Sequence, residues 1–361
     1  MTEIGLRKEE LDTPALWVDL DRLERNIAAI AGDLAGSGVQ WRPHTKGIKV
    51  PAIAHKMIAA GAIGVTCAKL GEAEVMAAAG IRDILVANQV VGPQKVTRLA
   101  ALQRAADVKS AVDCVENVDE IAAAARAVGV EVGLLVDVNT GMNRTGVEPG
   151  EPALALAKHV MATAGVRLRG LMTWEGHALE HTDVNEKAAA IHHSIGLLLE
   201  TAALCRHAGL PIEIVSGGGG GTYRVTGHIA GMTEVQAGGA IFCDQTYQSW
   251  GVDLEPALFL HARVTSRPTS TRVICDTGFK SATRGFLTPQ PVQFAASKVA
   301  LSAEHGIITL PEPSATPKVG ETFDLVVGYG DATVFLHDTL YGVRAGWVES
   351  VWAVAGRGRL R

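Results

Sequence analysis

Cysteine is scarce in this sequence, and the cysteines present form none of the motifs that cysteine-based sites require. The five cysteines are widely spaced and odd in number, and no Cys-x-x-Cys pair occurs among them. This pattern excludes a disulfide framework or a zinc cluster as the organising feature of the chain. We therefore expect a reducing compartment, namely the cytoplasm.

Long apolar segments are also missing. No uninterrupted hydrophobic run reaches the ~18 residues that a membrane span needs. The charged N-terminus lacks the apolar centre of a signal peptide. The net charge of −5 gives no electrostatic reason to expect nucleic acid or an acidic membrane surface as a partner. We expect neither a membrane nor a nucleic acid to be bound.

What is present is enough hydrophobic chain for one large domain and a smaller module: 361 residues, 47% of them hydrophobic. Up to residue 246, short β-like runs alternate with Ala-rich segments of helical periodicity. Eight such units predict parallel strands with crossover helices, and eight strands close a (β/α)8 barrel. An open doubly wound sheet is the alternative, because it does not require eight. The predicted strands are Val39–Trp41, Ile63–Thr66, Asp83–Ala87, Val108–Val112, Val132–Val136, Arg169–Thr173, Ile212–Val215 and Glu234–Ala237.

From residue 247 the pattern changes to β-branched runs, among them Val292–Val299, separated by Gly and Pro turns. We expect an all-β module here. The strand Ala15–Leu20 precedes the first barrel helix and is expected to join this module. Asp21 is expected to cap that helix, with Glu24 as its capping-box partner. The predicted boundaries are 22–246 for the barrel, and 1–21 with 247–361 for the β module.

The first predicted barrel strand ends in Arg-Pro-His-Thr-Lys, which places Lys46 at the strand end, with Lys49 three residues later. In barrels of this kind, chemistry gathers where the strands end. A lysine at such a position can form a Schiff base with pyridoxal phosphate (PLP). The alternative is that both lysines are ordinary surface charges.

Five consecutive glycines, Gly217–Gly221, follow the seventh predicted strand. Loops after the last two strands are the frequent phosphate site of such barrels, and glycines let N–H groups approach an anion closely. Thr222 is expected to add its hydroxyl. No Lys-Ser/Thr pair follows, so the segment is not a Walker A loop. Because the first and last strands are neighbours in a closed barrel, one phosphate-bearing aldehyde could connect Lys46 to the glycines.

Five motifs in this order resemble those of the D-threonine aldolase/D-serine dehydratase group, PLP enzymes with the alanine racemase-like fold. They are RPHTKGIK, NTGMNRTG, GLMTWEGHALEH, SGGGGGTY and EVQAGGAIFCD, and the similarity extends nearly end to end. The resemblance implies that Lys46 holds PLP. It places Gln236 where racemases have an arginine against the pyridine nitrogen. The cofactor-binding residues that it implies are Lys46, Arg144, Gly219, Gly220, Gly221, Thr222, Tyr223, Gln236, Gly238 and Gly239.

The sequence departs from this group at VGYGDATVFLHD. Metal-dependent members have a histidine there, followed two positions later by an acidic or cysteine ligand. Asp331 is retained as a metal ligand, but Tyr329 replaces the histidine. A neutral phenol is a poor ligand for Mg²⁺ or Mn²⁺. Either no metal binds, or His337 or Asp338 compensates, or the substrate is held differently.

The resemblance implies a homodimeric PLP-dependent lyase that acts on a small amino acid. It would cleave a D-β-hydroxy-α-amino acid into an aldehyde and glycine or another amino acid. Such a cleavage needs a base at the β-hydroxyl, for which His181 is the first candidate and His177 the second. A D-amino-acid dehydratase, a racemase and a non-catalytic PLP carrier remain open. The β module argues against the carrier, because it would supply substrate contacts.

Overall fold

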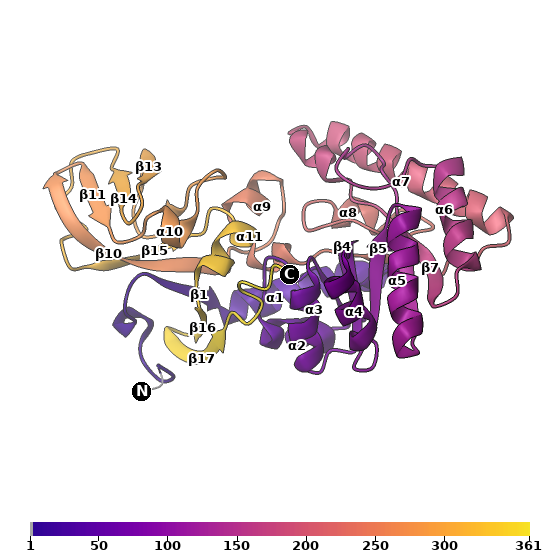
Figure 1. Cartoon of the computed structure of the whole chain (residues 1–361). Coiled ribbons are helices and arrows are strands. Elements are labelled where there is room, and N and C mark those ends of the chain that lie inside the picture. The colour runs from indigo at the N-terminus through magenta and orange to yellow at the C-terminus, as the bar shows by residue number, and fades with distance from the viewer. Residues whose placement is uncertain (1–2) are drawn as a thin grey trace. The chain divides into compact units, whose positions relative to one another are not determined.

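The computed structural model describes residues 3–361, which form two compact units. The first consists of the chain up to Ala28, Gly47–Ala52 and Gly239–Gly358. The second consists of Ala29–Lys46, Ile53–Gly238 and Arg359–Arg361. Figure 1 labels the α-helices and many of the strands of both units. The predicted boundaries at residues 22 and 246 lie near two of these divisions.

The second unit contains an eight-stranded parallel sheet in the order β2-β9-β8-β7-β6-β5-β4-β3. Residues after β2 close this sheet into a ring, because Thr66 N donates to Pro43 O at 2.9 Å and Thr45 N donates to Thr66 O at 2.7 Å. The predicted barrel is therefore confirmed, and the open sheet is excluded. The strands are β2 (Gln40–Trp41), β3 (Val65–Cys67), β4 (Asp83–Gln89), β5 (Asp107–Val112), β6 (Val132–Asp137), β7 (Val166–Met172), β8 (Ile214–Gly217) and β9 (Glu234–Val235).

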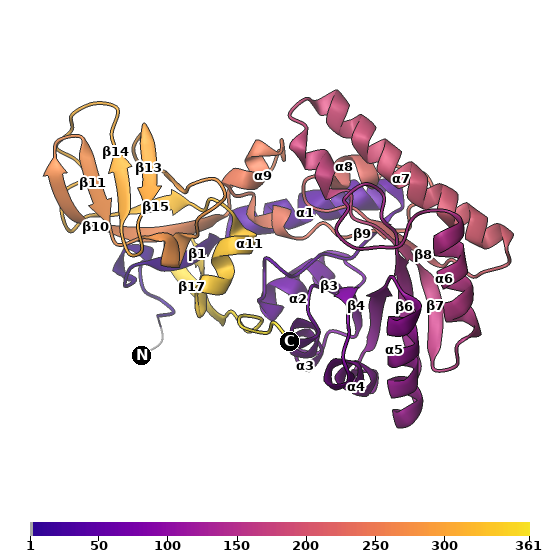
Figure 2. The ribbon, with the colours of Figure 1, turned by 45° about the horizontal axis from the view of Figure 1, so that its top comes forward.

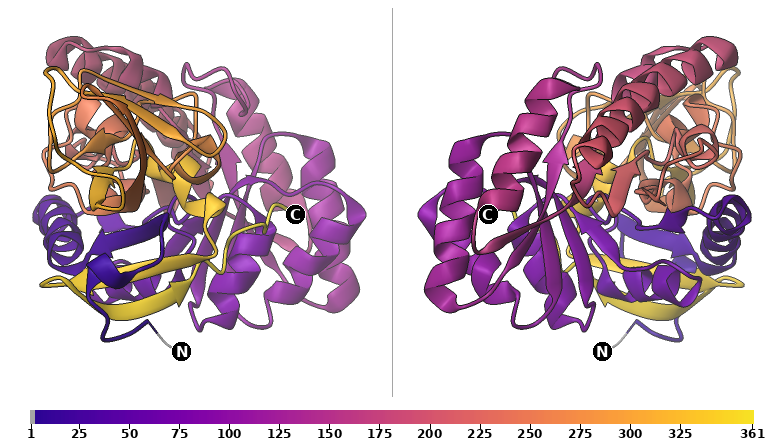
Figure 3. Two further views of the ribbon diagram at one scale, coloured as in Figure 1. Left: turned by 90° about the vertical axis from the view of Figure 1, so that its left-hand side faces the viewer. Right: turned by 90° about the vertical axis from the view of Figure 1, so that its right-hand side faces the viewer.

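Helices cover the outer face of this curved sheet, as both views in Figure 3 show. They are α1 (Leu20–Ser37), α2 (Pro51–Ala59), α3 (Leu70–Ala78), α4 (Pro93–Leu102), α5 (Val115–Val128), α6 (Glu151–Ala162), α7 (Val184–His207) and α8 (Tyr223–Thr226). One of the described helices, α7, is long and apolar enough to cross a membrane, but core helices of soluble proteins have the same properties.

Side chains inside the barrel change character along the strands, because every second residue of a strand points inward. The middle layer is apolar and comes from five neighbouring strands. Its buried members are Leu85, Ala111, Leu135, Met172 and Ile214. Charged side chains lie on the side of this layer where the strands begin. Polar side chains lie on the side where they end.

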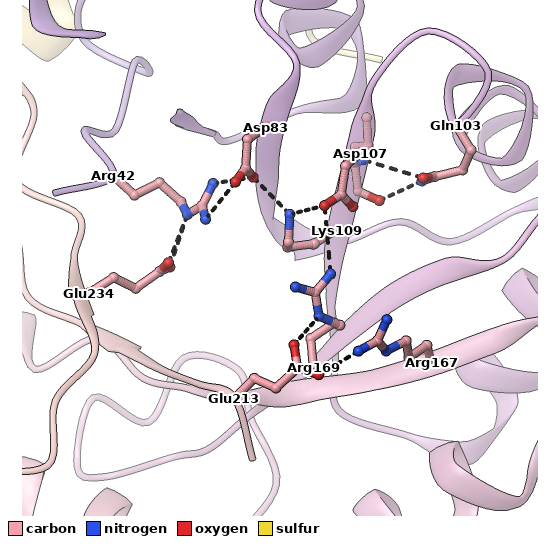
Figure 4. Close-up of polar contacts among 10 residues, drawn as sticks. Arg42, Asp83, Gln103, Asp107, Lys109, Arg167, Arg169, Glu213 and Glu234 are labelled. Atoms are coloured by element: carbon pink, nitrogen blue, oxygen red, sulfur yellow. Dashed lines mark hydrogen bonds and ion pairs between the residues drawn. The ribbon is translucent and has the colours of Figure 1, made fainter. Parts of the chain in front are cut away.

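At the beginning of the strands, eight charged residues form a chain of alternating sign (Figure 4). Arg42 is bonded to Asp83 at 2.5 Å and to Glu234 at 3.0 Å, and Lys109 is bonded to Asp83 at 2.7 Å. Burial alone would lower the pKa of the Arg42 guanidinium, but Glu234 and Asp83 outweigh it and raise that pKa. Four positive charges face four negative ones. The members in order are Glu234, Arg42, Asp83, Lys109, Asp107, Arg169, Glu213 and Arg167.

The first unit is built on a mostly antiparallel sheet in the order β13-β14-β11-β10-β1-β16-β17, with β15 pairing β10 and β12. Figure 2 labels β13, β14 and β11 at one side of this sheet. The prediction that the N-terminal strand joins this sheet is confirmed, because β1 pairs with β10 and β16. The strands are β1 (Ala15–Asp19), β10 (Leu258–Thr269), β11 (Arg272–Cys275), β12 (Gln290–Pro291), β13 (Lys298–Leu301), β14 (Gly306–Thr309), β15 (Thr322–Val326), β16 (Thr339–Arg344) and β17 (Trp347–Ala353). The short helices are α9 (Gln245–Ser249), α10 (Phe279–Ala282) and α11 (Gly330–Thr333).

Two local predictions are wrong. Asp21 does not cap α1, because the helix begins one residue earlier and Asp19 Oδ1 accepts the Arg22 N–H at 3.1 Å. Asp21 instead pairs with Arg344 of β16. The run Val292–Val299 is not one strand: β12 ends before it, and β13 begins only near its end. In both places tertiary pairing overrides local preference.

Candidate active site

Lys46 follows directly after the first barrel strand. Residues 42–45 extend β2, and His44 N donates to Gln236 O at 3.1 Å, so this backbone is held against the end of β9. The Lys46 side chain is exposed. Lys49 is only 9% exposed and has a φ of +57°. Of the two candidate lysines, Lys46 is therefore the one whose amine a ligand can reach.

The glycine segment follows β8, which is separated from β2 by β9 alone, so it leaves the same end of the barrel as Lys46. The N–H groups of Thr222 and Tyr223 donate to Gly219 O at 3.1 and 3.0 Å, which folds the segment into a tight turn. Within residues 3–361, the N–H groups of Gly220 and Gly221 meet no acceptor. Two adjacent backbone donors without partners suit an anionic group.

Glu175, which comes shortly after β7, holds this segment. Its carboxylate is fully buried and accepts hydrogen bonds from Gly218 N at 3.1 Å, the Thr222 hydroxyl at 2.7 Å and the Thr226 hydroxyl at 2.6 Å. The Thr222 oxygen also accepts the Gly219 N–H at 3.0 Å. The sequence predicts that the Thr222 hydroxyl serves a phosphate, whereas in the structure its proton goes to Glu175. Sequence reasoning assigned Glu175 no role, since an acid beside an anion site has no evident purpose until its donors are seen.

Three further predicted cofactor contacts lie in the same unit. Gln236 is buried, and its Nε2 donates to Ser216 Oγ at 2.9 Å. Gly238 packs so closely on the His44 carbonyl that a Cβ would overlap it, so glycine is required where the last and first strands meet. Tyr223 is buried at the start of α8. The barrel ring thus brings these residues toward the Lys46 end of the first strand.

The two candidate bases have different surroundings. The His181 side chain is 43% exposed, and its Nδ1 lies 3.5 Å from a Glu186 carboxylate oxygen. His177 Nε2 lies 3.3 Å from Ser194 Oγ, and its Nδ1 is buried without a hydrogen-bond partner. Because a buried polar atom without a partner costs free energy, His177 Nδ1 is an unsatisfied group, whereas the exposed His181 ring is solvated.

Sequence reasoning also missed a polar cluster that anchors the loop of Arg144. Gln89 Nε2 donates to carboxylate oxygens of Asp113 and Asp137, at 3.1 and 3.0 Å, and the Thr145 hydroxyl donates to Asp137 at 2.9 Å. Burial raises the pKa of the Asp137 carboxyl, although the hydrogen bonds from Thr145 and Gln89 oppose it. Arg144 itself is exposed. Asp137 is the last residue of β6 and Asp113 directly follows β5, and this position at the strand ends is the signal that could have identified the cluster.

Asp331, the predicted metal ligand, belongs to the first unit. Its carboxylate fills the space that a Cβ on residue 47 would need, and Gly47 directly follows Lys46 in the chain. Gly239 packs against the same carboxylate. Burial, together with the charge of Asp331 and a hydrogen bond to it, raises the pKa of the Tyr329 phenol.

The donors around Asp331 do not fit Mg²⁺ or Mn²⁺. His337 Nε2 lies 2.7 Å from Ser281 O, and Asp338 pairs with Arg357. Neither of the two predicted compensating residues therefore joins Asp331 in a ligand set. In the part of the chain that the structure describes, no three His, Cys, Asp or Glu side chains gather where they could hold a metal ion. A phenol and one carboxylate are a weak set for a hard cation.

A closed (β/α)8 barrel with a strand-end lysine, joined in the chain to a β module, defines the class: proteins of the alanine racemase-like fold. Residues 18–246 match the family "Alanine racemase, N-terminal domain", and residues 257–343 match a serine dehydratase domain. The chain belongs to this family. Within it, the chain is 34% identical to D-threonine aldolase of an Arthrobacter species, over 96% of this chain and 93% of that protein.

Three other relatives are similar along almost their whole length. 3-Hydroxy-D-aspartate aldolase of Paracoccus denitrificans is 32% identical over 98% of this chain and 94% of its own. The crystal structure of D-threonine aldolase from Filomicrobium marinum has a TM-score of 0.97 and 35% identity, with both chains fully covered. D-threo-3-hydroxyaspartate dehydratase of a Delftia species has a TM-score of 0.87 and 28% identity, over 96% of this chain and 98% of that one.

The residues present fit PLP, the cofactor that the family implies. Among the residues that the structure describes, the Gly220 and Gly221 N–H groups meet no acceptor, and they suit a phosphate. Lys46 offers an accessible amine for the aldehyde. The donors and the amine leave the same end of the barrel, on two strands, β8 and β2, that only β9 separates.

Proposed function

We propose that this chain is a PLP-dependent lyase that cleaves a D-β-hydroxy-α-amino acid into an aldehyde and a smaller amino acid. The observation that carries the proposal is the match along almost the whole chain to aldolases, together with a lysine and an anion site on one end of the barrel. The substrate class comes from the names of these relatives.

Different residues of the chain bind the cofactor and transfer the proton. Lys46 holds the cofactor aldehyde, the Gly220 and Gly221 N–H groups hold its phosphate, and Gln236 lies at the ring. PLP, when bound, withdraws electrons from a bond at the substrate Cα. A histidine takes the proton from the β-hydroxyl oxygen, so that the Cα–Cβ bond breaks and the aldehyde leaves. No metal takes part in this account.

Product analysis tests the proposal. The purified protein, supplied with PLP, is incubated separately with D-threonine, D-3-hydroxyaspartate and their L-enantiomers. The proposal expects glycine and an equimolar aldehyde from a D-substrate only. Keto acid plus ammonia would instead identify a dehydratase, which one relative, 35% identical over 67% of this chain, is named to be. Conversion between enantiomers without cleavage would identify a racemase.

Replacing each histidine identifies the base. Because His177 has a buried unpartnered Nδ1 and His181 is largely solvated, His177→Asn should lower kcat by about 10²–10⁴-fold. His181→Asn should change it little. Cofactor absorbance should be unchanged in both variants, which controls for misfolding. A larger loss of kcat in His181→Asn than in His177→Asn would instead identify His181 as the base.

We also infer a cytoplasmic homodimer, from the cysteine pattern and from the resemblance. Light scattering coupled to size-exclusion chromatography gives the mass of the particle, with 37.9 kDa expected per chain. A monomer at working concentration would contradict the dimer. Fractionation of expressing cells would test the compartment.

A further inference from the structure

The geometry points to Glu175 as a positioning residue that shapes the phosphate site without touching the phosphate. The inference rests on the proposed function, because it assumes that PLP places its phosphate at Gly220 and Gly221. Nothing in the family resemblance assigns Glu175 a role. Its fully buried side chain is instead explained by the three donors around it.

The carboxylate connects both ends of the glycine segment. One oxygen accepts the Gly218 N–H at the beginning of the segment, at 3.1 Å. The other accepts the hydroxyls of Thr222 and Thr226, at 2.7 and 2.6 Å, and Thr226 is the last residue of α8. One rigid group therefore sets the separation of residues 218, 222 and 226. Gly220 and Gly221 lie between the fixed points.

The hydrogen bonds also decide which groups remain for the anion. Gly218 and Gly219 give their N–H groups to Glu175 and to the Thr222 oxygen. Thr222 gives its hydroxyl proton to Glu175 and its own N–H to Gly219 O. Only the Gly220 and Gly221 N–H groups are left over in this part of the loop. Glu175 thus accepts the Gly218 N–H itself and orients Thr222 to accept the Gly219 N–H, which leaves the N–H groups of the next two glycines for the anion.

The surrounding packing supports a fixed loop. Gly218 has a φ of +72°, a region that L side chains rarely adopt, so the turn is built for glycine. The Trp174 ring lies where a Cβ on Gly219 would come within 2.5 Å of its atoms. Trp174 therefore restrains the glycine loop by packing against it, and Glu175 restrains the same loop by hydrogen bonds. Neither residue needs to reach the ligand to act on it.

The test compares two cofactor forms on the full-length protein, freed of cofactor and titrated again by absorbance and protein fluorescence. PLP carries the phosphate and pyridoxal does not. Glu175→Ala should weaken PLP binding by at least about tenfold, because buried donors lose their acceptor and the loop loses its shape. Binding of pyridoxal should stay within about twofold of wild type, because its aldehyde still meets Lys46. Inorganic phosphate should compete with PLP in the wild type and more weakly in the variant.

Glu175→Gln is the conservative control. A glutamine can accept the Gly218 N–H through its oxygen and donate to the two threonine oxygens through its amide, so the three links survive. PLP affinity should then stay within about threefold of wild type. Thr226→Val removes one link only, and should weaken PLP selectively but less than Glu175→Ala. It also decides the matter if Glu175→Ala cannot be recovered folded.

The outcomes are separable. Equal weakening of PLP and pyridoxal, or no weakening of either, overturns the inference. So does a Gln variant as weak as the Ala variant, since charge and not hydrogen-bonded geometry would then matter. With Glu175→Ala unfolded, a Thr226→Val protein that binds PLP normally overturns it too. If the wild type binds no PLP at all, the proposed function itself fails.

Discussion

The two ends of the barrel are both rich in polar side chains, but they use them in opposite ways. Where the strands begin, charged residues of alternating sign pair with one another, and Arg42, Lys109 and Glu234 are almost completely buried. Where the strands end, the Lys46 side chain is exposed, and in the described part of the chain the N–H groups of Gly220 and Gly221 meet no acceptor. The first end satisfies its own groups and stabilises the ring. The second leaves groups unsatisfied that a ligand can then satisfy.

This contrast between the two ends indicates where a binding site can form in a barrel of this kind. A buried charge without a partner would cost several kcal/mol. At the end where the strands begin, the charged groups therefore pair with one another, and these groups are not available to a ligand. At the opposite end, an exposed amine or an unpaired backbone N–H costs less free energy than a buried unpaired charge. Hydrogen bonds to a bound ligand offset that cost. Variants at each end should therefore change different measurements.

The largest expected effect is that of Lys46→Ala at the binding end. It should abolish cleavage and remove the absorbance of the bound cofactor, because Lys46 is the exposed one of the two candidate lysines. The free energy of unfolding measured without cofactor should be unchanged. Absorbance that persists would mean that another lysine, Lys49 first, holds PLP.

The matching variant at the opposite end is Arg42→Met. It leaves Glu234 buried without its guanidinium partner, and should lower the free energy of unfolding by about 3–5 kcal/mol. Urea denaturation measures this. Cofactor affinity of the folded fraction should be retained. Arg25→Met, which breaks an exposed pair with Glu255, is the control and should leave stability unchanged.

A smaller effect concerns acid stability. Burial would raise the pKa of the Asp83 carboxyl, but Arg42 and Lys109 outweigh it and lower that pKa. A carboxyl whose pKa is lower in the folded state stabilises fully above its unfolded value of about 3.9, and loses this stabilisation as pH falls through the folded value. Asp83→Asn should therefore destabilise the protein at neutral pH and flatten the loss of stability below pH ~4. If the free energy of unfolding fell with pH below pH ~4 as steeply in the variant as in the wild type, Asp83 would not account for the acid sensitivity.

The smallest expected effect is that of chelation. Because no group of three metal-ligating side chains occurs at Tyr329 and Asp331 or elsewhere in residues 3–361, EDTA should not change activity or melting temperature. Tyr329→His restores the histidine of the metal-dependent pattern, and should make the melting temperature rise with added Mn²⁺ where the wild type does not respond. Loss of wild-type activity in EDTA, recovered by Mn²⁺, would show that a metal is held after all.

Much of the fold could be predicted because the spacing of apolar residues along the chain indicates each strand and helix without reference to distant residues. All eight barrel strands were located within a few residues, since apolar runs of strand length alternate with helical spacing. Strand β16, TLYGVR, was missed, although it lies between β1 and β17, because Gly342 interrupts its run of strand-favouring residues. The candidate site was predictable in part for the same reason: Lys46 and the glycines are contiguous with strand ends.

The chain's sequence alone determined the barrel, the β module, the strand-end lysine and the glycine segment, because each is carried by neighbouring residues whose pattern needs no distant partner. Only the tertiary structure decided which polar groups are paired. Arg42 and Glu234 are 192 residues apart, and Glu175 and Thr226 are 51 apart. Closure of the ring brings such pairs within hydrogen-bonding distance, and that pairing determines which donors remain for a ligand.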